Sequence, residues 1–166
     1  MVCGLLGGRY KIMDFEELYR NLAGEWKGEN LLRLSWMTPP EHVSPAGLFV
    51  IPAAKEKFLS FNYTWIHENI PQEGIILVGF DTQQNLATGA WIDSWHQSIA
   101  VMFCRGTIGR DGTIDLRGTY AAPPDPDWRW RIVITTPSIS ELRIEMYNCS
   151  PEGAEDLAVR AEYKRV

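Results

Sequence analysis

Two charged residues, Asp93 and Arg105, occur in segments that are otherwise rich in aromatic and aliphatic side chains. Side chains alternate between the two faces of a strand, and short hairpin turns set which residues share a face. This arithmetic places both charges on one face with several aromatic rings. An arginine inside such a chamber would hold a carboxylate through charge-assisted hydrogen bonds. The expected ligand-binding residues are Trp91, Asp93, Trp95, Phe103, Arg105 and Tyr120.

This assignment depends on the lengths of the turns. It takes Gln83-Gln84 as a two-residue turn, His96–Ser98 as a three-residue turn and Gly109–Gly112 as a four-residue turn. The resulting facing pairs are Ile76 with Trp91, Val78 with Gly89, Arg105 with Gly89 and Arg105 with Leu116, so Leu116 is also expected on the inner face. A slip of one residue would reverse the face of everything downstream. A buried unpaired charge costs several kcal/mol, about 3 or more, so two other interpretations stay open. Asp93 and Arg105 could form an internal ion pair with water, or the strand register could differ.

A second charged cluster comprises Arg129, Arg131, Glu145, Tyr147 and Arg160. Pairing across Pro137-Ser138 places Arg131 near Glu145. The opposite face of the same segments, which includes Trp130, is strongly apolar and reads as a core. The charged set is therefore expected on the exterior, where ion pairs contribute little to stability. Acid–base chemistry by an inward-facing cluster is the alternative, and the catalytic residues of any such enzyme stay unassigned.

The three histidines, His42, His67 and His96, have no partner at the spacing of a metal site, and each reads as a surface or loop-edge side chain. If the strands of this chain form a barrel, His96 is the best placed of the three to lie at its mouth. No nucleophile elbow, phosphate-binding loop or catalytic triad spacing is present. We therefore predict neither a metal site nor a cofactor.

The cysteines and the composition bear on location and partners. Cys3, Cys104 and Cys149 form no C-x-x-C pair, and we expect all three to be free thiols in a cytoplasmic protein. The formal charge of −5 argues against a nucleic-acid partner. No apolar run approaches the roughly 20 residues of a membrane span. A homodimer is left open.

The pattern of the elements is that of one domain over residues 1–166. Asp14 to Ala23 predicts a helix, with Asp14 as N-cap and Gly24 after its end. Thr38 to Pro45 predicts a loop because of its prolines. Strands are expected at Gly24–Trp36, Gly47–Ala53, Lys57–Glu68, Gly74–Phe80, Leu86–Trp95, Ile99–Ile108, Thr113–Ala121, Arg129–Thr135, Glu141–Asn148 and Leu157–Arg165. About ten strands with short turns indicate an antiparallel up-and-down barrel.

Five short motifs, in this order, resemble the bacterial domain-of-unknown-function family 1579. They are Gly24-x-Trp26-x-Gly28, Gly79-Phe80-Asp81, Trp91-Ile92-Asp93-Ser94, Glu145-Met146-Tyr147 and Tyr163-x-Arg165. The resemblance runs from Leu22 to Arg165 and implies a lipocalin-like fold with no settled activity. By analogy with the wider superfamily, Trp26 and Arg165 would pack across the closed end of the barrel.

Two related barrel types narrow the choice of ligand. Nitrobindin-like barrels share the Gly-x-Trp-x-Gly opening but ligate haem through a histidine near the C-terminus, and the last strand here has none. Haem binding is therefore expected to be absent or weak. Fatty-acid-binding proteins close with Arg-x-Tyr, whereas this chain has Arg160-Ala161-Glu162-Tyr163.

The sequence thus predicts an all-β, lipocalin-like barrel with one short N-terminal helix. The expected function is binding of a small apolar or amphipathic molecule in the barrel cup. A barrel-interior acid–base enzyme is one alternative. A structural or interaction module with a filled barrel is the other.

Overall fold

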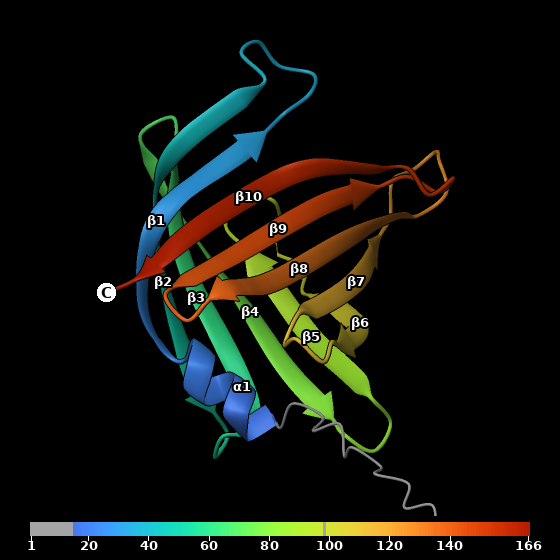
Figure 1. Cartoon of the computed structure of the whole chain (residues 1–166). Coiled ribbons are helices and arrows are strands. Elements are labelled where there is room, and N and C mark those ends of the chain that lie inside the picture. The colour runs from blue at the N-terminus through green and yellow to red at the C-terminus, as the bar shows by residue number, and fades with distance from the viewer. Residues whose placement is uncertain (1–14, 98) are drawn as a thin grey trace, which may run out of the picture.

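The chain folds into a closed antiparallel β-barrel with a short helix at one end (Figure 1). The computed structural model describes residues 15–97 and 99–166. The elements in this part are α1 (Phe15–Leu22), β1 (Gly24–Arg33), β2 (Glu41–Ala53), β3 (Phe58–His67), β4 (Ile70–Asp81), β5 (Leu86–Asp93), β6 (Met102–Ile108), β7 (Ile114–Tyr120), β8 (Trp128–Ser138), β9 (Glu141–Cys149) and β10 (Glu155–Arg165).

Each strand pairs with its neighbours in the sequence, and β1 closes the barrel by pairing with β10. This order is the simplest one for ten strands joined by hairpins, and closure leaves no sheet edge exposed. The expected up-and-down barrel of about ten strands with one N-terminal helix is confirmed. No helix in the described residues is long and apolar enough to cross a bilayer.

Helix α1 and the first strand together close one end of the barrel. Leu18 and Leu22 on the helix are buried, and the Trp26 indole is fully buried and donates a hydrogen bond to the Leu22 carbonyl at 2.9 Å. The Arg165 guanidinium lies 4.0 Å from the centre of the Trp26 ring and donates to the Ala23 carbonyl at 2.9 Å. The expected packing of Trp26 with Arg165 across this end is confirmed.

The two glycines that flank Trp26 serve different purposes. Gly24 has a φ of +133°, a backbone conformation that residues with a Cβ rarely adopt. Gly28 lies where β1 runs against β10, and a Cβ there would be 1.8 Å from the carbonyl oxygen of Glu162. The Gly-x-Trp-x-Gly motif therefore joins the helix to the barrel and lets the closing pair of strands approach.

Substitution of Gly28 tests this close approach. We expect Gly28→Ala to lower the free energy of unfolding by about 1–3 kcal/mol, because the clash is with backbone and no side chain can move aside. Gly47→Ala is the matched control, since its Cβ would meet only the Thr64 hydroxyl at 3.0 Å. Urea unfolding followed by circular dichroism measures both. Equal midpoints for wild type and Gly28→Ala would contradict the close approach.

The half of the barrel next to α1 is packed with side chains. Fully buried residues there come from all around the sheet: Trp26, Leu48, Leu59, Phe61, Ile76, Val78, Ile114, Leu116, Ile132 and Ile134. The apolar face predicted for the last three strands points inward, as the burial of Ile132, Ile144 and Tyr163 confirms. This layer leaves only the opposite half of the barrel for a cavity.

Several predicted strand boundaries are wrong, among them those of β1 and β2. Strand β1 ends at Arg33 rather than at Trp36, which is 76% exposed. Strand β2 begins at Glu41 and includes Pro45, which the prediction placed in a loop. Pairing of β2 with β3 begins only at Gly47, so Pro45 lies where β2 has one paired neighbour, and proline is tolerated at such positions.

Two of the three cysteines lie in the described part of the chain, and both are free and buried. Burial raises the pKa of the Cys104 thiol to about 11, which keeps it protonated and unreactive at neutral pH. Cys3 lies outside the described residues, so the expectation of three free thiols stays a prediction.

Candidate binding cavity at the open end

A cavity of about 460 Å³ occupies the end of the barrel opposite α1. Its walls come from strand ends and connections on that side of the barrel, and most of the contributing side chains are apolar or aromatic. The lining residues are Leu32, Arg33, Leu34, Trp36, Trp91, Trp95, His96, Gln97, Ala100, Val101, Met102, Thr119, Tyr120, Ala121, Trp130, Asn148, Asp156 and Ala158. A concave apolar space of this size is typical of small-molecule sites.

Aromatic rings form part of the wall. The indoles of Trp91 on β5 and Trp130 on β8 are stacked, with ring centres 5.3 Å apart and an angle of 6° between their planes. The His96 imidazole lies among them, 5.8 Å from the Trp91 ring and 5.6 Å from the Trp130 ring. Trp95 meets His96 edge-on at 4.8 Å. Flat, rigid surfaces of this kind suit a planar apolar ligand.

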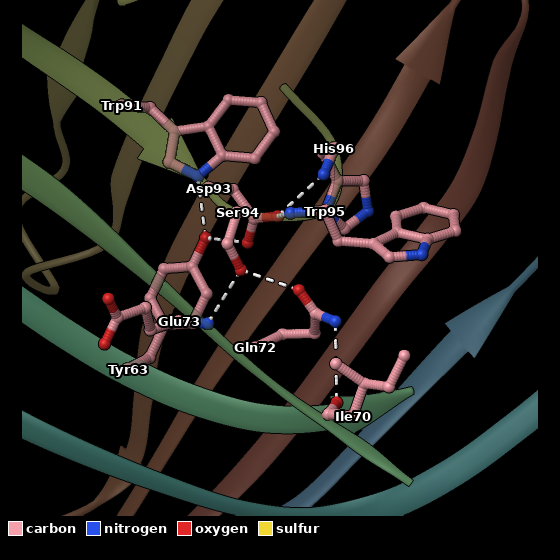
Figure 2. Close-up of polar contacts among 9 residues, drawn as sticks. All are labelled: Tyr63, Ile70, Gln72, Glu73, Trp91, Asp93, Ser94, Trp95 and His96. Carbon is pink, nitrogen blue, oxygen red and sulfur yellow. Dashed lines mark hydrogen bonds and ion pairs between the residues drawn. The ribbon is translucent and has the colours of Figure 1, made fainter. Parts of the chain in front are cut away.

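The carboxylate of Asp93, at the end of β5, organises the turn that carries Trp95 and His96 (Figure 2). One oxygen, Oδ1, accepts hydrogen bonds from the backbone N–H groups of Trp95 at 2.8 Å and His96 at 2.7 Å. The same oxygen lies 3.0 Å from His96 Nδ1. The other oxygen, Oδ2, accepts from the Tyr63 hydroxyl at 2.8 Å. Asp93 therefore folds the chain back and fixes the imidazole.

A neighbouring serine fastens the same turn to β4. The Ser94 backbone N–H donates to the Glu73 carbonyl at 2.9 Å, and the Glu73 N–H donates to Ser94 Oγ at 3.0 Å. Ser94 Oγ in turn donates to Gln72 Oε1 at 2.7 Å, and Figure 2 shows both contacts of Ser94 Oγ. The turn is thus held on both sides.

The direction of each proton in this network follows from the chemistry of its members. Trp91 Nε1–H can only donate, and it donates to the Tyr63 oxygen at 2.8 Å. Burial and then the nearby Asp93 carboxylate raise the pKa of Tyr63 well above its ordinary value, so its hydroxyl stays protonated and donates to Asp93.

Asp93 itself is ionised. Burial alone would raise the pKa of Asp93, but the hydrogen bonds from the side chain and backbone of His96 and from the Tyr63 hydroxyl hold it below its ordinary value. An ionised carboxylate can only accept, so His96 Nδ1 must carry a proton. In the neutral imidazole, Nε2 is then left as an acceptor.

Two buried polar atoms at the cavity have no hydrogen-bond partner within residues 15–97 and 99–166. They are His96 Nε2 and Trp130 Nε1, an acceptor and a donor on two rings that both line the cavity. Buried polar groups are nearly always hydrogen-bonded, so each unpaired one calls for an explanation. A polar group of a bound molecule would supply the missing partner.

The rim of the cavity carries side chains that satisfy one another. Arg33 lies 3.4 Å from Asp156, and the Tyr120 hydroxyl donates to Asn148 Oδ1 at 2.6 Å. Among the described lining residues, only Arg33 and Asp156 are of the aspartate, glutamate, lysine or arginine type. No unpaired fixed charge therefore faces the cavity from this set.

The structure brings together four of the six predicted site residues. Trp91, Trp95 and Tyr120 line the cavity, and Asp93 is buried directly behind His96. Their inward orientation agrees with the hairpin arithmetic, while their role in binding a ligand stays a prediction.

The other two predicted site residues are placed wrongly. Phe103 is 78% exposed and Arg105 also points outward, with Arg105 opposite Thr88 rather than Gly89. The cause is the connection from β5 to β6, which runs from residue 94 to 101 instead of turning over three residues. Trp91 consequently faces Met102, so Met102 and Cys104 take the inward positions. Arg105 cannot hold a ligand carboxylate in the barrel.

A second slip restores the register downstream. The connection from β6 to β7 spans residues 109–113, one residue more than expected, so Gly106 rather than Arg105 faces Leu116. The two errors cancel, which is why Leu116 and Tyr120 were correctly assigned to the inner face.

The second charged cluster lies on the outside of the barrel, as expected. Arg131 pairs with Asp115 at 2.8 Å and with Glu155 at 2.7 Å, and Arg160 pairs with Glu145 at 2.8 Å. Arg131 therefore does not pair with Glu145, as the predicted register had suggested, because Glu145 faces Val133. Neither Arg105 nor Arg131 joins a carboxylate inside the barrel.

Sequence reasoning missed the importance of His96 and of Trp130. His96 was taken as a loop-edge residue and as the histidine best placed for a barrel mouth, where it does lie, but it was given no role. Trp130 was taken as ordinary core. One signal could have revealed the first: an aspartate at the end of a strand tends to accept bonds from the N–H groups two and three residues on, which turns residue 96 back toward residue 93. In the described residues, no group of three or more potential metal ligands is present.

The sequence family described as "Protein of unknown function (DUF1579)" matches residues 11–165, nearly the whole chain. The chain belongs to this family. Within this DUF1579 barrel, the motif Trp91-Ile92-Asp93-Ser94 leads into the cavity, while Gly24-x-Trp26-x-Gly28 closes the opposite end.

The fold has a counterpart among solved structures. The crystal structure of Rv2717c from M. tuberculosis is similar, with a TM-score of 0.62 over 94% of this chain and 99% of that chain. The identity is 12%, so the likeness extends to the fold alone. A comparison with curated proteins found no match.

Proposed function

We propose that this DUF1579 barrel binds a small, largely apolar molecule in the cavity at its open end. The observation that carries the proposal is the cavity of about 460 Å³, walled by stacked indoles and aliphatic side chains. A barrel that served only as a structural module would gain stability by filling this space, as the half beside α1 is filled. Leaving it open costs packing contacts, which ligand binding would explain.

The preferred ligand is a molecule without a permanent charge. Arg33 and Asp156 at the rim pair with each other, and Asp93 is engaged with Tyr63 and His96. A permanently charged ligand would therefore bring an unpaired charge into an apolar space, which is costly. Binding energy would come from burial of flat apolar surface against the Trp91 and Trp130 rings.

Filling the cavity tests the proposal. The probe is N-phenyl-1-naphthylamine, whose fluorescence rises in apolar surroundings. We expect saturable binding to the wild type, and we expect Ala158→Trp, which places an indole in the cavity, to weaken binding about tenfold or more. Ala154→Trp is the matched control, because Ala154 is exposed in the connection before β10 and does not line the cavity.

Two outcomes count against the proposal. Absence of saturable binding to the folded wild type would remove its basis. Equal weakening by Ala154→Trp and Ala158→Trp would show that the probe does not occupy this cavity. Native mass spectrometry of freshly purified protein provides a second readout, since a tightly held natural ligand would add its mass to the chain.

A further inference from the structure

We infer that the ligand of this cavity carries a hydroxyl group, and that His96 and Trp130 bind it together. The inference rests on the proposed function and names the chemical class of its ligand: a planar, neutral molecule of the phenol or aromatic-alcohol type. A hydroxyl both donates and accepts a hydrogen bond. The cavity offers one unpaired acceptor, His96 Nε2, and one unpaired donor, Trp130 Nε1–H.

The network behind His96 fixes which nitrogen carries the proton in the neutral ring. Asp93 Oδ1 accepts a hydrogen bond from His96 Nδ1–H at 3.0 Å, and the chain from Trp91 through Tyr63 leaves Asp93 only able to accept. In the neutral imidazole Nε2 is then the acceptor, and the carboxylate behind the ring also fixes its orientation. His96 is thereby prepared to accept a hydrogen bond from the cavity side.

The donor lies close to this acceptor. The Trp130 ring is 5.6 Å from the His96 ring, and its Nε1–H, buried without a partner, cannot accept. A hydroxyl on a ligand ring lying along the aromatic wall is within reach of both rings. It would donate a hydrogen bond to His96 Nε2 and accept one from Trp130 Nε1–H. Each of the two unpaired atoms would then be satisfied by a single group.

Other ligand heads fit less well. A methyl group would leave both buried atoms unpaired, which costs more than the lost hydrogen bonds alone. A carboxylate would bring a negative charge toward the ionised Asp93 and would carry no proton for His96 Nε2. A hydroxyl avoids both penalties, which is why the geometry favours it.

The test compares three ligands of nearly equal shape by their displacement of N-phenyl-1-naphthylamine: 2-naphthol, 2-methylnaphthalene and 2-naphthoate. We expect 2-naphthol to bind the wild type about tenfold tighter than 2-methylnaphthalene, the effect of two ordinary hydrogen bonds. We expect 2-naphthoate to bind more weakly than 2-naphthol.

Two variants each remove one partner of the hydroxyl. His96→Phe and Trp130→Phe should each reduce the preference for 2-naphthol to about threefold or less, while 2-methylnaphthalene still binds. Retained binding of 2-methylnaphthalene shows that a variant is folded. Trp130→Phe keeps an aromatic ring in place, so it tests the inference even where His96→Phe disturbs the turn.

His67→Phe and Trp128→Phe are the matched controls, because neither residue lines the cavity. Both controls should keep the full preference.

The outcomes separate the two proposals. If none of the compounds binds the folded wild type, the proposed function itself fails. If the compounds bind but 2-naphthol has no advantage, if 2-naphthoate binds tightest, or if both His96→Phe and Trp130→Phe keep the full preference, only the hydroxyl inference is overturned.

Discussion

Replacing Trp26 by alanine is expected to lower the free energy of unfolding by about 3–5 kcal/mol, the usual cost of removing a large buried aromatic side chain. The Trp26 ring is fully buried, bonds the end of α1 through the Leu22 carbonyl, and lies under the Arg165 guanidinium. The truncation therefore removes apolar contacts and also the support for the helix that closes the barrel.

Trp36→Ala is the matched control for this substitution. Trp36 follows the other end of β1 and is 76% exposed, so the same change should alter stability by about 0.5 kcal/mol or less. Urea unfolding monitored by circular dichroism compares the two variants with wild type. A Trp26→Ala protein that unfolds at the wild-type midpoint would refute the placement of Trp26 at the centre of the closed end.

Replacing Asp93 by asparagine is expected to cost about 2–4 kcal/mol near neutral pH, because hydrogen bonds to a buried charged group are strong and their loss leaves buried partners unsatisfied. The asparagine oxygen can still accept from the N–H groups of Trp95 and His96. Its NH2 group, however, would replace the oxygen that accepts from the Tyr63 hydroxyl. Tyr63 would then face two donors, this NH2 group and Trp91 Nε1–H, and would lose its acceptor.

The cost should depend on pH in a defined direction. The pKa of Asp93 is lowered in the folded protein, so its ionised form stabilises the fold above the unfolded pKa of about 3.9, and this contribution is lost as the pH falls through the lower, folded value. The stability difference between wild type and Asp93→Asn should therefore be largest above about pH 5 and shrink below about pH 4. Tyr63 and His96 are the other titratable groups in contact with Asp93.

Denaturant unfolding at a series of pH values from 2 to 7 measures this difference. Asp81→Asn is the control, because Asp81 is exposed, accepts from the N–H groups of Gln83 and Gln84, and can be replaced in that role by an asparagine oxygen. Its effect should be about 0.5 kcal/mol or less at every pH. A wild-type advantage over Asp93→Asn that stays constant down to pH 2 would contradict an ionised, stabilising Asp93.

The barrel and its closed end could be predicted from sequence because their signals are local. Alternation identifies strands, and the spacing of Gly24, Trp26 and Gly28 reflects contacts within one short segment and its closing partner. The hairpin from β4 to β5 was also correct: Ile76 faces Trp91 and Val78 faces Gly89, although the loop spans residues 82–85. Adding one residue to each side of a turn leaves the register of its strands unchanged.

The cavity could be predicted only in part, since its composition depends on two connections of unpredictable length. The connection between β5 and β6 begins with a folded-back turn held by Asp93 and Ser94, and the extra length of this connection moved Phe103 and Arg105 to the outside. The same turn brought His96 inward. No periodic pattern reports on such a segment, because its shape is set by hydrogen bonds to a neighbouring strand.

Strand period and turn chemistry act over a few residues, so the all-β class, the order of the strands, the helix that covers one end and the inward position of Trp91 and Asp93 could be derived from the sequence. The extent of the hollow at the open end and the polar atoms that face it follow from the closed sheet. The His96 acceptor comes from the turn after β5, and the Trp130 donor comes from β8. These segments meet only when the sheet closes. Closure is a property of the whole sheet, so the chemistry of the cavity emerges at that level.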